Sequence, residues 1–154
     1  MKVLVVVGEG DREPRAHVDE LSIAHQVTVA ATQPFDAPEG VRVERFERGG
    51  ALLEHLHRAA STHDVVIFYG FEHEICAAGM RIVPERAALV PLVRDPLALG
   101  ERSSQALFHL PRVFGFTSAA EEELVRARFR NGHIPGELLS EDGALERLLV
   151  LASQ

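Results

Sequence analysis

The feature that most constrains the fold is a pair of short, almost unbroken apolar runs. Lys2–Val7 contains only Val and Leu after its lysine, and residues 64–69 contain only Val, Ile, Phe and Tyr after an aspartate. An alternating pattern would indicate a strand with one wet face, whereas continuous runs of this length are typical of strands covered by helices on both faces. The two runs therefore predict the central strands of a parallel sheet.

Shorter apolar runs alternate with helical periodicities along the rest of the chain. Residues 41–46 alternate strictly between apolar and polar, which predicts a strand with one wet face at an edge of the sheet. A strand is also predicted at residues 88–93, and because Pro91 lacks a backbone N–H, we expect an edge position or a bulge there. The other predicted strands are residues 27–31 and 113–116. Helices are predicted over residues 14–25, 52–60, 75–82, 101–110, 119–129 and 141–152.

Strands that alternate with helices in this order are typical of an α/β fold. We predict a single doubly wound, mostly parallel sheet of about six strands with helices on both faces, in a Rossmann-like arrangement. No linker, repeat or low-complexity tract interrupts the chain, so one domain is expected over residues 1–154. The leucines of the last helix can pack in the core, cover a partner-facing surface or mediate dimerisation; they are Leu145, Leu148, Leu149 and Leu151.

Charge and cysteine content exclude several classes of protein. The net charge is −7, and Lys2 is the single lysine among scattered arginines, whereas nucleic-acid binding needs clustered cations. The single cysteine, Cys76, excludes an internal disulfide and is expected to be a buried packing residue. The first apolar run is about six residues long, too short for a signal sequence or a membrane span. We therefore expect a cytoplasmic protein without a transmembrane segment.

Thr117 and Ser118 join a predicted strand to a predicted helix. Ser118 and Glu121 have the spacing of a capping box, in which the hydroxyl accepts a free backbone N–H and the carboxylate reaches back to the cap residue. Acidic residues in the first turn also suit the positive end of the helix dipole. This junction should therefore lie at the edge of the sheet where ligands bind.

Ligands of open parallel sheets lie beyond the carboxyl ends of the strands, so residues in or beside the loops there are the candidate binding residues. These candidates are Gly8, Gly10, His17, Gly70, Glu72, His73, Arg94, Asp95 and Ser118. No catalytic role is assigned to any of them.

The loop at residues 70–74 has the most versatile chemistry. Glu72, His73 and Glu74 can act as acid–base groups, because a histidine titrates near neutral pH and stands here between two carboxylates. The alternative is that the two glutamates cap the following helix and His73 is solvent-exposed.

Two further groups of candidates also allow two interpretations. His17 faces the first loop if its helix begins at Pro14, or else it is a surface residue of the first turn. Arg94 and Asp95 either hold a phosphate or a sugar hydroxyl, or form a local ion pair before the proline that follows them.

Cofactor and metal motifs are incomplete. Gly8 and Gly10 begin a dinucleotide fingerprint, but Glu13 stands at the third glycine position, where a carboxylate repels phosphate. No Walker sequence occurs. His55 and His57 lie two residues apart on a predicted helix and point in different directions, and no HExxH or Cys–His spacing is found. We therefore expect neither a cofactor nor a metal.

Six segments follow one another in an order that is found in a known enzyme class. They are MKVLVVVG, HVDELSIAHQVTVAAT, VRVERF, HDVVIFYG, LVPLVRDP and RVFGFTSAAEEELVRARF, all within residues 1–129. This order resembles the N-terminal, acceptor-side domain of GT-B glycosyltransferases of the glycogen-synthase-like superfamily. The chain departs from that family in its acidic first loop and in Arg94, where the family has a histidine.

The resemblance implies that the domain takes a sugar or glycoconjugate acceptor. In that family a second Rossmann-like domain holds the nucleotide sugar. That domain is expected beyond Gln154 and is missing from this sequence, so we expect this domain to be catalytically incompetent alone and to need a second glycosyltransferase domain or a homodimer. Two alternatives stay open: a non-catalytic Rossmann-like interaction or dimerisation module, and a flavodoxin-like small-molecule-binding domain.

Overall fold

The computed structural model describes residues 1–8 and 12–154. Its elements, in chain order, are β1 (Lys2–Val7), α1 (Arg12–Leu21), β2 (Gln26–Ala31), β3 (Arg42–Arg45), α2 (Gly49–Ala59), β4 (Val65–Tyr69), α3 (Glu74–Ile82), η1 (Pro84–Arg86), β5 (Ala87–Val90), η2 (Pro96–Gly100), α4 (Arg102–Leu107), β6 (Val113–Phe116), α5 (Ala119–Phe129), β7 (Gly136–Leu138) and α6 (Ala144–Ser153).

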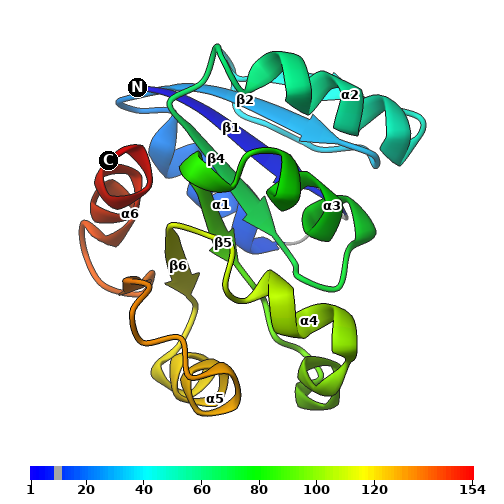
Figure 1. Ribbon diagram of the computed structural model, residues 1–154. Helices are drawn as coiled ribbons and strands as arrows, with labels where there is room; N and C mark the ends of the chain where they lie inside the picture. The colour runs from blue at the N-terminus through cyan, green and yellow to red at the C-terminus, as the bar shows by residue number, and fades with distance from the viewer. Residues whose placement is uncertain (9–11) are drawn as a thin grey trace.

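All the described strands lie in one parallel sheet, which confirms the predicted Rossmann-like α/β fold (Figure 1). The sheet has seven strands in the order β3-β2-β1-β4-β5-β6-β7. The two continuous apolar runs form β1 and β4, which are neighbours at its centre, and the alternating segment forms the edge strand β3, as predicted. The seventh strand, β7, was not predicted, because three residues reading Gly-Glu-Leu carry no apolar run.

Several expected element boundaries differ from the observed ones, and two of these differences change the role of a particular residue. The strand β5 ends at Val90 and lies between β4 and β6, so Pro91 follows the strand and requires neither an edge position nor a bulge. The first helix ends at Leu21 instead of His25. The His25 ring instead lies between the chain's amino group, 3.1 Å from Nδ1, and Glu146 of α6, 2.7 Å from Nε2.

Helices cover both faces of the sheet. One face packs against α1 and α6, and the other against α2, α3, α4 and α5. Leu145, Leu148 and Leu149 of α6 are buried against the first face together with Val3 and Val5 of β1. Of the roles open to these leucines, core packing is therefore the one that the structure supports.

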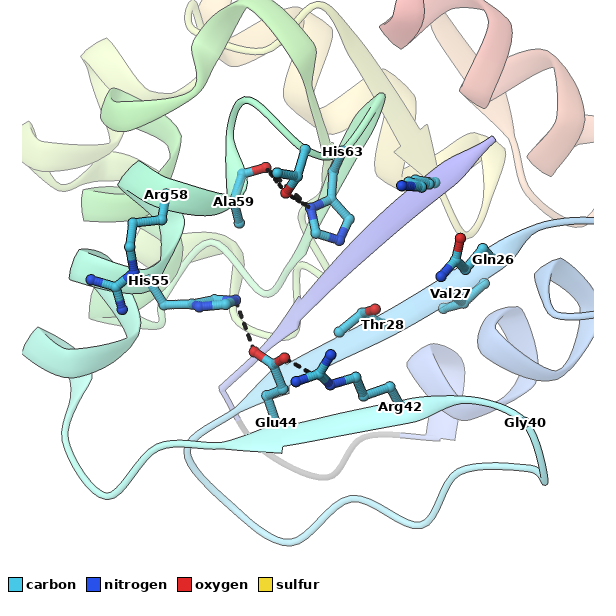
Figure 2. Close-up of a pocket in the computed structure, with 12 residues that line it drawn as sticks. Gln26, Val27, Thr28, Gly40, Arg42, Glu44, His55, Arg58, Ala59 and His63 are labelled. Atoms are coloured by element: carbon cyan, nitrogen blue, oxygen red, sulfur yellow. Dashed lines mark hydrogen bonds and ion pairs between the residues drawn. The ribbon is translucent and has the colours of Figure 1, made fainter.

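The α2 side of the sheet is apolar near the carboxyl ends of its strands and polar near their amino ends. Lys2 of β1 is in register with Gln26 of β2, and Thr28 of β2 with Arg42 of β3. Because side chains alternate along a strand, these residues share one face with Leu4, which is fully buried. Figure 2 shows the resulting hollow between the amino ends of the strands and α2.

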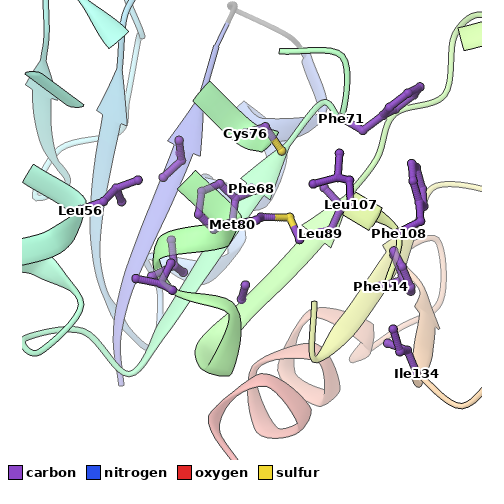
Figure 3. Packing of buried hydrophobic residues seen from close by; sticks show 14 of the residues in the cluster. Leu56, Phe68, Phe71, Cys76, Met80, Leu89, Leu107, Phe108, Phe114 and Ile134 are labelled. Atoms are coloured by element: carbon purple, nitrogen blue, oxygen red, sulfur yellow. The ribbon is translucent and has the colours of Figure 1, made fainter. Parts of the chain in front are cut away.

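Close packing fixes the helices on this side. A Cβ added to Gly79 of α3 would lie 2.6 Å from Cε1 of Phe68 and 2.9 Å from Cδ1 of Leu56, so α3 approaches both β4 and α2 through a glycine. Phe68 and Met80 lie at the centre of this core, and Cys76 is buried beside them (Figure 3). This packing holds the amino end of α3 at the carboxyl edge of the sheet.

Candidate functional site

The strand order places the expected ligand crevice between β1 and β4. From β1 the chain continues to β2 on one side and later returns to β4 on the other, which makes the carboxyl ends of these two strands the switch point of the sheet. Gly8 follows β1 and Gly70 follows β4, and Val7 is in register with Tyr69. The two candidate glycines are therefore neighbours at this point.

The imidazole of His73 lies over both glycines. A Cβ on Gly8 would be 2.6 Å from Cγ of His73, and one on Gly70 would be 2.4 Å from Cδ2. Gly70 also has a φ of +85°, which favours glycine in its own right. The sequence placed these glycines in loops where a ligand would approach the backbone. In the structure, the space left by their missing Cβ atoms is filled by the His73 ring.

The backbone of His73 starts the helix α3. His73 is the N-cap residue, and its carbonyl accepts hydrogen bonds from the N–H groups of Cys76 at 3.0 Å and Ala77 at 3.3 Å. Its side chain is half-buried and makes no capping hydrogen bond. The expectation that His73 is solvent-exposed is therefore wrong.

Beside His73, a pocket of about 300 Å³ opens between α3 and α4. We call it the carboxyl-edge pocket; it is lined by Phe71, Glu72, His73, Glu74, Ala77, Glu101, Ser103, Ser104 and Leu107. Its volume is at the lower end of the range for small-molecule sites, about 300–1,000 Å³. Phe71 forms a rigid part of the wall, because it is buried and packs edge-to-face on Phe108 with ring centres 5.3 Å apart.

The chemistry of the carboxyl-edge pocket is dominated by hydrogen-bond acceptors. Glu72, Glu74 and Glu101 are exposed at its rim, and no lysine or arginine is among the described residues that line it. Ser104 is buried and donates its hydroxyl to the carbonyl of Ala98 at 3.2 Å, whereas Ser103 is exposed. Such a lining favours ligands that bring hydroxyl donors and repels phosphates.

His17 lies on the other face of the sheet. Its Nδ1 is 2.8 Å from the phenolic oxygen of Tyr69, the last residue of β4. Burial lowers the pKa of His17, although Glu13 nearby acts in the opposite direction. His17 therefore joins α1 to the end of β4 and does not line the carboxyl-edge pocket.

Of the two roles open to Arg94 and Asp95, the local ion pair is not found between these two described residues. A guanidinium nitrogen of Arg94 lies 3.3 Å from a carboxylate oxygen of Glu13, which links the segment after β5 to α1. Asp95 instead caps η2 by accepting a hydrogen bond from the N–H of Leu97 at 3.0 Å. Gly10, the remaining glycine candidate, lies outside the described residues.

The Ser118 hydroxyl caps α5, as predicted, by accepting the N–H of Glu121 at 3.1 Å. The carboxylate of Glu121 reaches one residue further back than a capping box requires, to the N–H of Thr117 at 3.0 Å. Its other oxygen accepts the N–H of Val93 at 2.9 Å. Sequence reasoning missed this second bond, which fastens the segment after β5 to the end of β6.

Two other kinds of site were sought along the described part of the chain. Residues 1–8 and 12–154 contain no group of three or more His, Cys, Asp or Glu arranged to hold a metal ion. None of the helices described is both long enough and apolar enough to cross a lipid bilayer.

The sequence matches no protein-family model and no curated protein.

Proposed function

We propose that the chain is the acceptor-side domain of a GT-B-like glycosyltransferase and that its carboxyl-edge pocket holds the acceptor sugar. The observation that carries the proposal is the position of His73, whose ring lies over Gly8 and Gly70 at the switch point and also lines the pocket. A titratable side chain at the expected ligand crevice is thereby in direct reach of a molecule in that pocket.

The lining of the pocket fits a neutral, polyhydroxylated ligand. The carboxylates of Glu72, Glu74 and Glu101 accept hydrogen bonds from sugar hydroxyls, and the Ser103 hydroxyl can donate or accept. Phe71 is almost fully buried and contributes only a small apolar part of the pocket wall, so the polar rim supplies most of the contacts to the ligand. An acceptor is therefore a better ligand here than a nucleotide sugar, whose pyrophosphate the carboxylates repel.

In this proposal the nucleotide-sugar donor binds to a different domain. In a dinucleotide-binding sheet the glycines at this point let the pyrophosphate approach the backbone, but in this chain His73 takes that space. Sugar transfer needs donor and acceptor held together. The resemblance assigns the donor to a second domain, so this domain alone should bind an acceptor without transferring sugar.

The test is the binding of neutral saccharides to the chain, measured by saturation-transfer NMR and isothermal titration calorimetry. Maltose, lactose and N-acetylglucosamine are the first probes, with UDP-glucose and GDP-mannose alongside them. We expect binding of at least one saccharide and none of either nucleotide sugar. Binding of a nucleotide sugar without any saccharide would contradict the proposal.

Two variants locate the binding. Glu72→Gln and Glu101→Gln each remove a charged acceptor from the pocket rim, where both residues are exposed and folding is little affected. Each should weaken saccharide binding by about three- to tenfold. Glu123→Gln, an exposed change on α5, is the matched control and should leave binding unchanged. Equal binding by all three variants would contradict the assigned pocket.

A further inference from the structure

A second pocket lies at the opposite edge of the sheet, and its chemistry is the reverse of the first. It has a volume of about 360 Å³ and lies between the amino ends of β1 to β3 and the last turns of α2 (Figure 2). We call it the amino-edge pocket. The strand β1, six residues long, separates it by about 17 Å from the carboxyl edge.

Cations gather in this pocket although the chain as a whole carries a net charge of −7. The sole lysine of the chain, Lys2, is among them. The basic residues that line it are Lys2, Arg42, His55, Arg58 and His63, against the single acid Glu44. Sequence reasoning found scattered arginines; the register of the strands and the position of α2 bring these side chains together.

The one carboxylate of the pocket is already paired. Glu44 lies 2.9 Å from Nε of Arg42 through one oxygen and 2.9 Å from Nε2 of His55 through the other. The approach to Nε2 of His55 is close but lacks the alignment of a hydrogen bond. Glu44 is therefore engaged by Arg42 and His55, and no ion pair of Glu44 with Lys2 or Arg58 is found in the described part of the chain.

Lys2 and Arg58 supply positive charge that no ion pair between described residues engages. Over residues 1–8 and 12–154, no carboxylate forms an ion pair with the Lys2 ammonium or the Arg58 guanidinium. Asp64, close to the start of β1, instead accepts the backbone N–H of Lys2 at 2.8 Å.

Side chains also contact the carbonyl groups at the C-terminal end of α2, which is the negative end of the helix dipole. The carbonyl of Ala59 faces Nδ1 of His63 at 3.1 Å, and Arg86 donates to the carbonyls of Ala60 and His63. These contacts satisfy the carbonyl groups that would otherwise repel an anion. Because Nδ1 of His63 faces the carbonyl of Ala59, the rest of the ring points into the space between α2 and Thr28 (Figure 2).

We propose that the amino-edge pocket binds a small phosphate ester. Lys2 and Arg58 provide charge for the phosphate, and His63, Gln26, Thr28 and Thr62 provide hydrogen-bonding groups for the rest of a hydroxylated ester. The pocket falls within the size range of small-molecule sites, about 300–1,000 Å³. This site does not depend on the carboxyl-edge pocket, because the two differ in position and in charge.

The test is a titration of the whole chain with glucose 6-phosphate, with glucose and inorganic phosphate as partial ligands. Amide shifts in a two-dimensional NMR spectrum should appear at Lys2, Gln26, Thr28 and Thr62 and not at Gly70. We expect the ester to bind more tightly than either partial ligand. No binding of the ester, or equal affinity for inorganic phosphate, would overturn the assignment.

Charge-removing variants complete the test. Lys2→Gln and Arg58→Gln are both exposed changes that leave the pair of Glu44 with Arg42 intact. Each should weaken glucose 6-phosphate binding by about threefold, and the double variant by about tenfold. Arg81→Gln, also exposed and on a helix, is the control and should bind as the unchanged chain does. Unchanged binding by the double variant would overturn the proposal.

Discussion

The Nδ1 of His17 and the phenolic oxygen of Tyr69 lie 2.8 Å apart and join the helix α1 to the last residue of β4. Burial lowers the pKa of His17 and raises the pKa of Tyr69, so both groups are held in their neutral forms. The contact fixes α1 at the edge of the sheet that carries the switch point.

The burial of His17 makes the stability of the fold depend on pH. Folding lowers the pKa of His17 below the ordinary histidine value of 6.5, so near and below that pH the unfolded chain binds more protons than the folded chain. The contribution of His17 is thus present above pH 6.5 and is lost as the pH falls through the folded pKa. Urea unfolding between pH 8 and about pH 5 measures this loss. In the His17→Gln variant the free energy of unfolding should fall less steeply with decreasing pH than in the unchanged chain. The exposed control His57→Gln should behave as the unchanged chain does. Identical slopes in all three proteins would contradict the assignment.

Removing the carboxylate of Glu121 should destabilise the fold strongly. Glu121→Ala leaves the N–H groups of Thr117 and Val93 without their partner at a residue that is only 8% exposed. The expected loss is about 2–4 kcal/mol, measured by urea unfolding. The control Glu123→Ala, exposed on the same helix, should change stability by less than about 0.5 kcal/mol. Equal effects of the two substitutions would show that the carboxylate bridge contributes little.

The same substitution at two helical glycines should have opposite effects. Gly79→Ala places a Cβ 2.6 Å from the Phe68 ring, and overpacking should outweigh the gain in helix propensity, with a net loss of about 1–2 kcal/mol. Gly50→Ala meets nothing within 4 Å and should raise stability by up to about 1 kcal/mol. Thermal unfolding of the two variants gives the comparison. A Gly79→Ala protein as stable as Gly50→Ala would mean that α3 can move away from β4 at little cost.

The thiol of Cys76 should be unreactive in the folded protein. Cys76 is buried on α3, so a reagent reaches its thiol poorly. Burial also raises the pKa of the thiol, so little of it is in the reactive thiolate form. Reaction with Ellman's reagent, followed by absorbance, should be slow in buffer and fast in urea. Rapid reaction in buffer would show that α3 opens readily.

The sequence was sufficient to predict the sheet where the apolar signal is strong. Continuous runs identified β1 and β4, and alternation identified the edge strand β3. The strand β7 could not be predicted, because its three residues carry no pattern and it forms by pairing with β6. Pro91 was misplaced because strand ends are set by register, and here the pairing ends at Val90.

The candidate site was predicted in its location but not in its contacts. Gly70 and His73 were expected at the carboxyl edge, yet the imidazole of His73 over Gly8 depends on how α3 packs against two strands. The second bond of Glu121, to Val93, joins residues 28 positions apart, which no local pattern reveals. The basic lining of the amino-edge pocket likewise arises only when α2 and three strand ends come together.

The carboxyl-edge pocket as a binding site for sugar hydroxyls is tested most directly by mapping backbone amide shifts during a titration with maltose. The largest shifts should occur at Phe71, His73 and Ser103, with no change at Lys2 or Thr28 of the amino-edge pocket. If maltose, lactose and N-acetylglucosamine all leave the Phe71, His73 and Ser103 signals unmoved while UDP-glucose shifts them, the proposed acceptor site is contradicted.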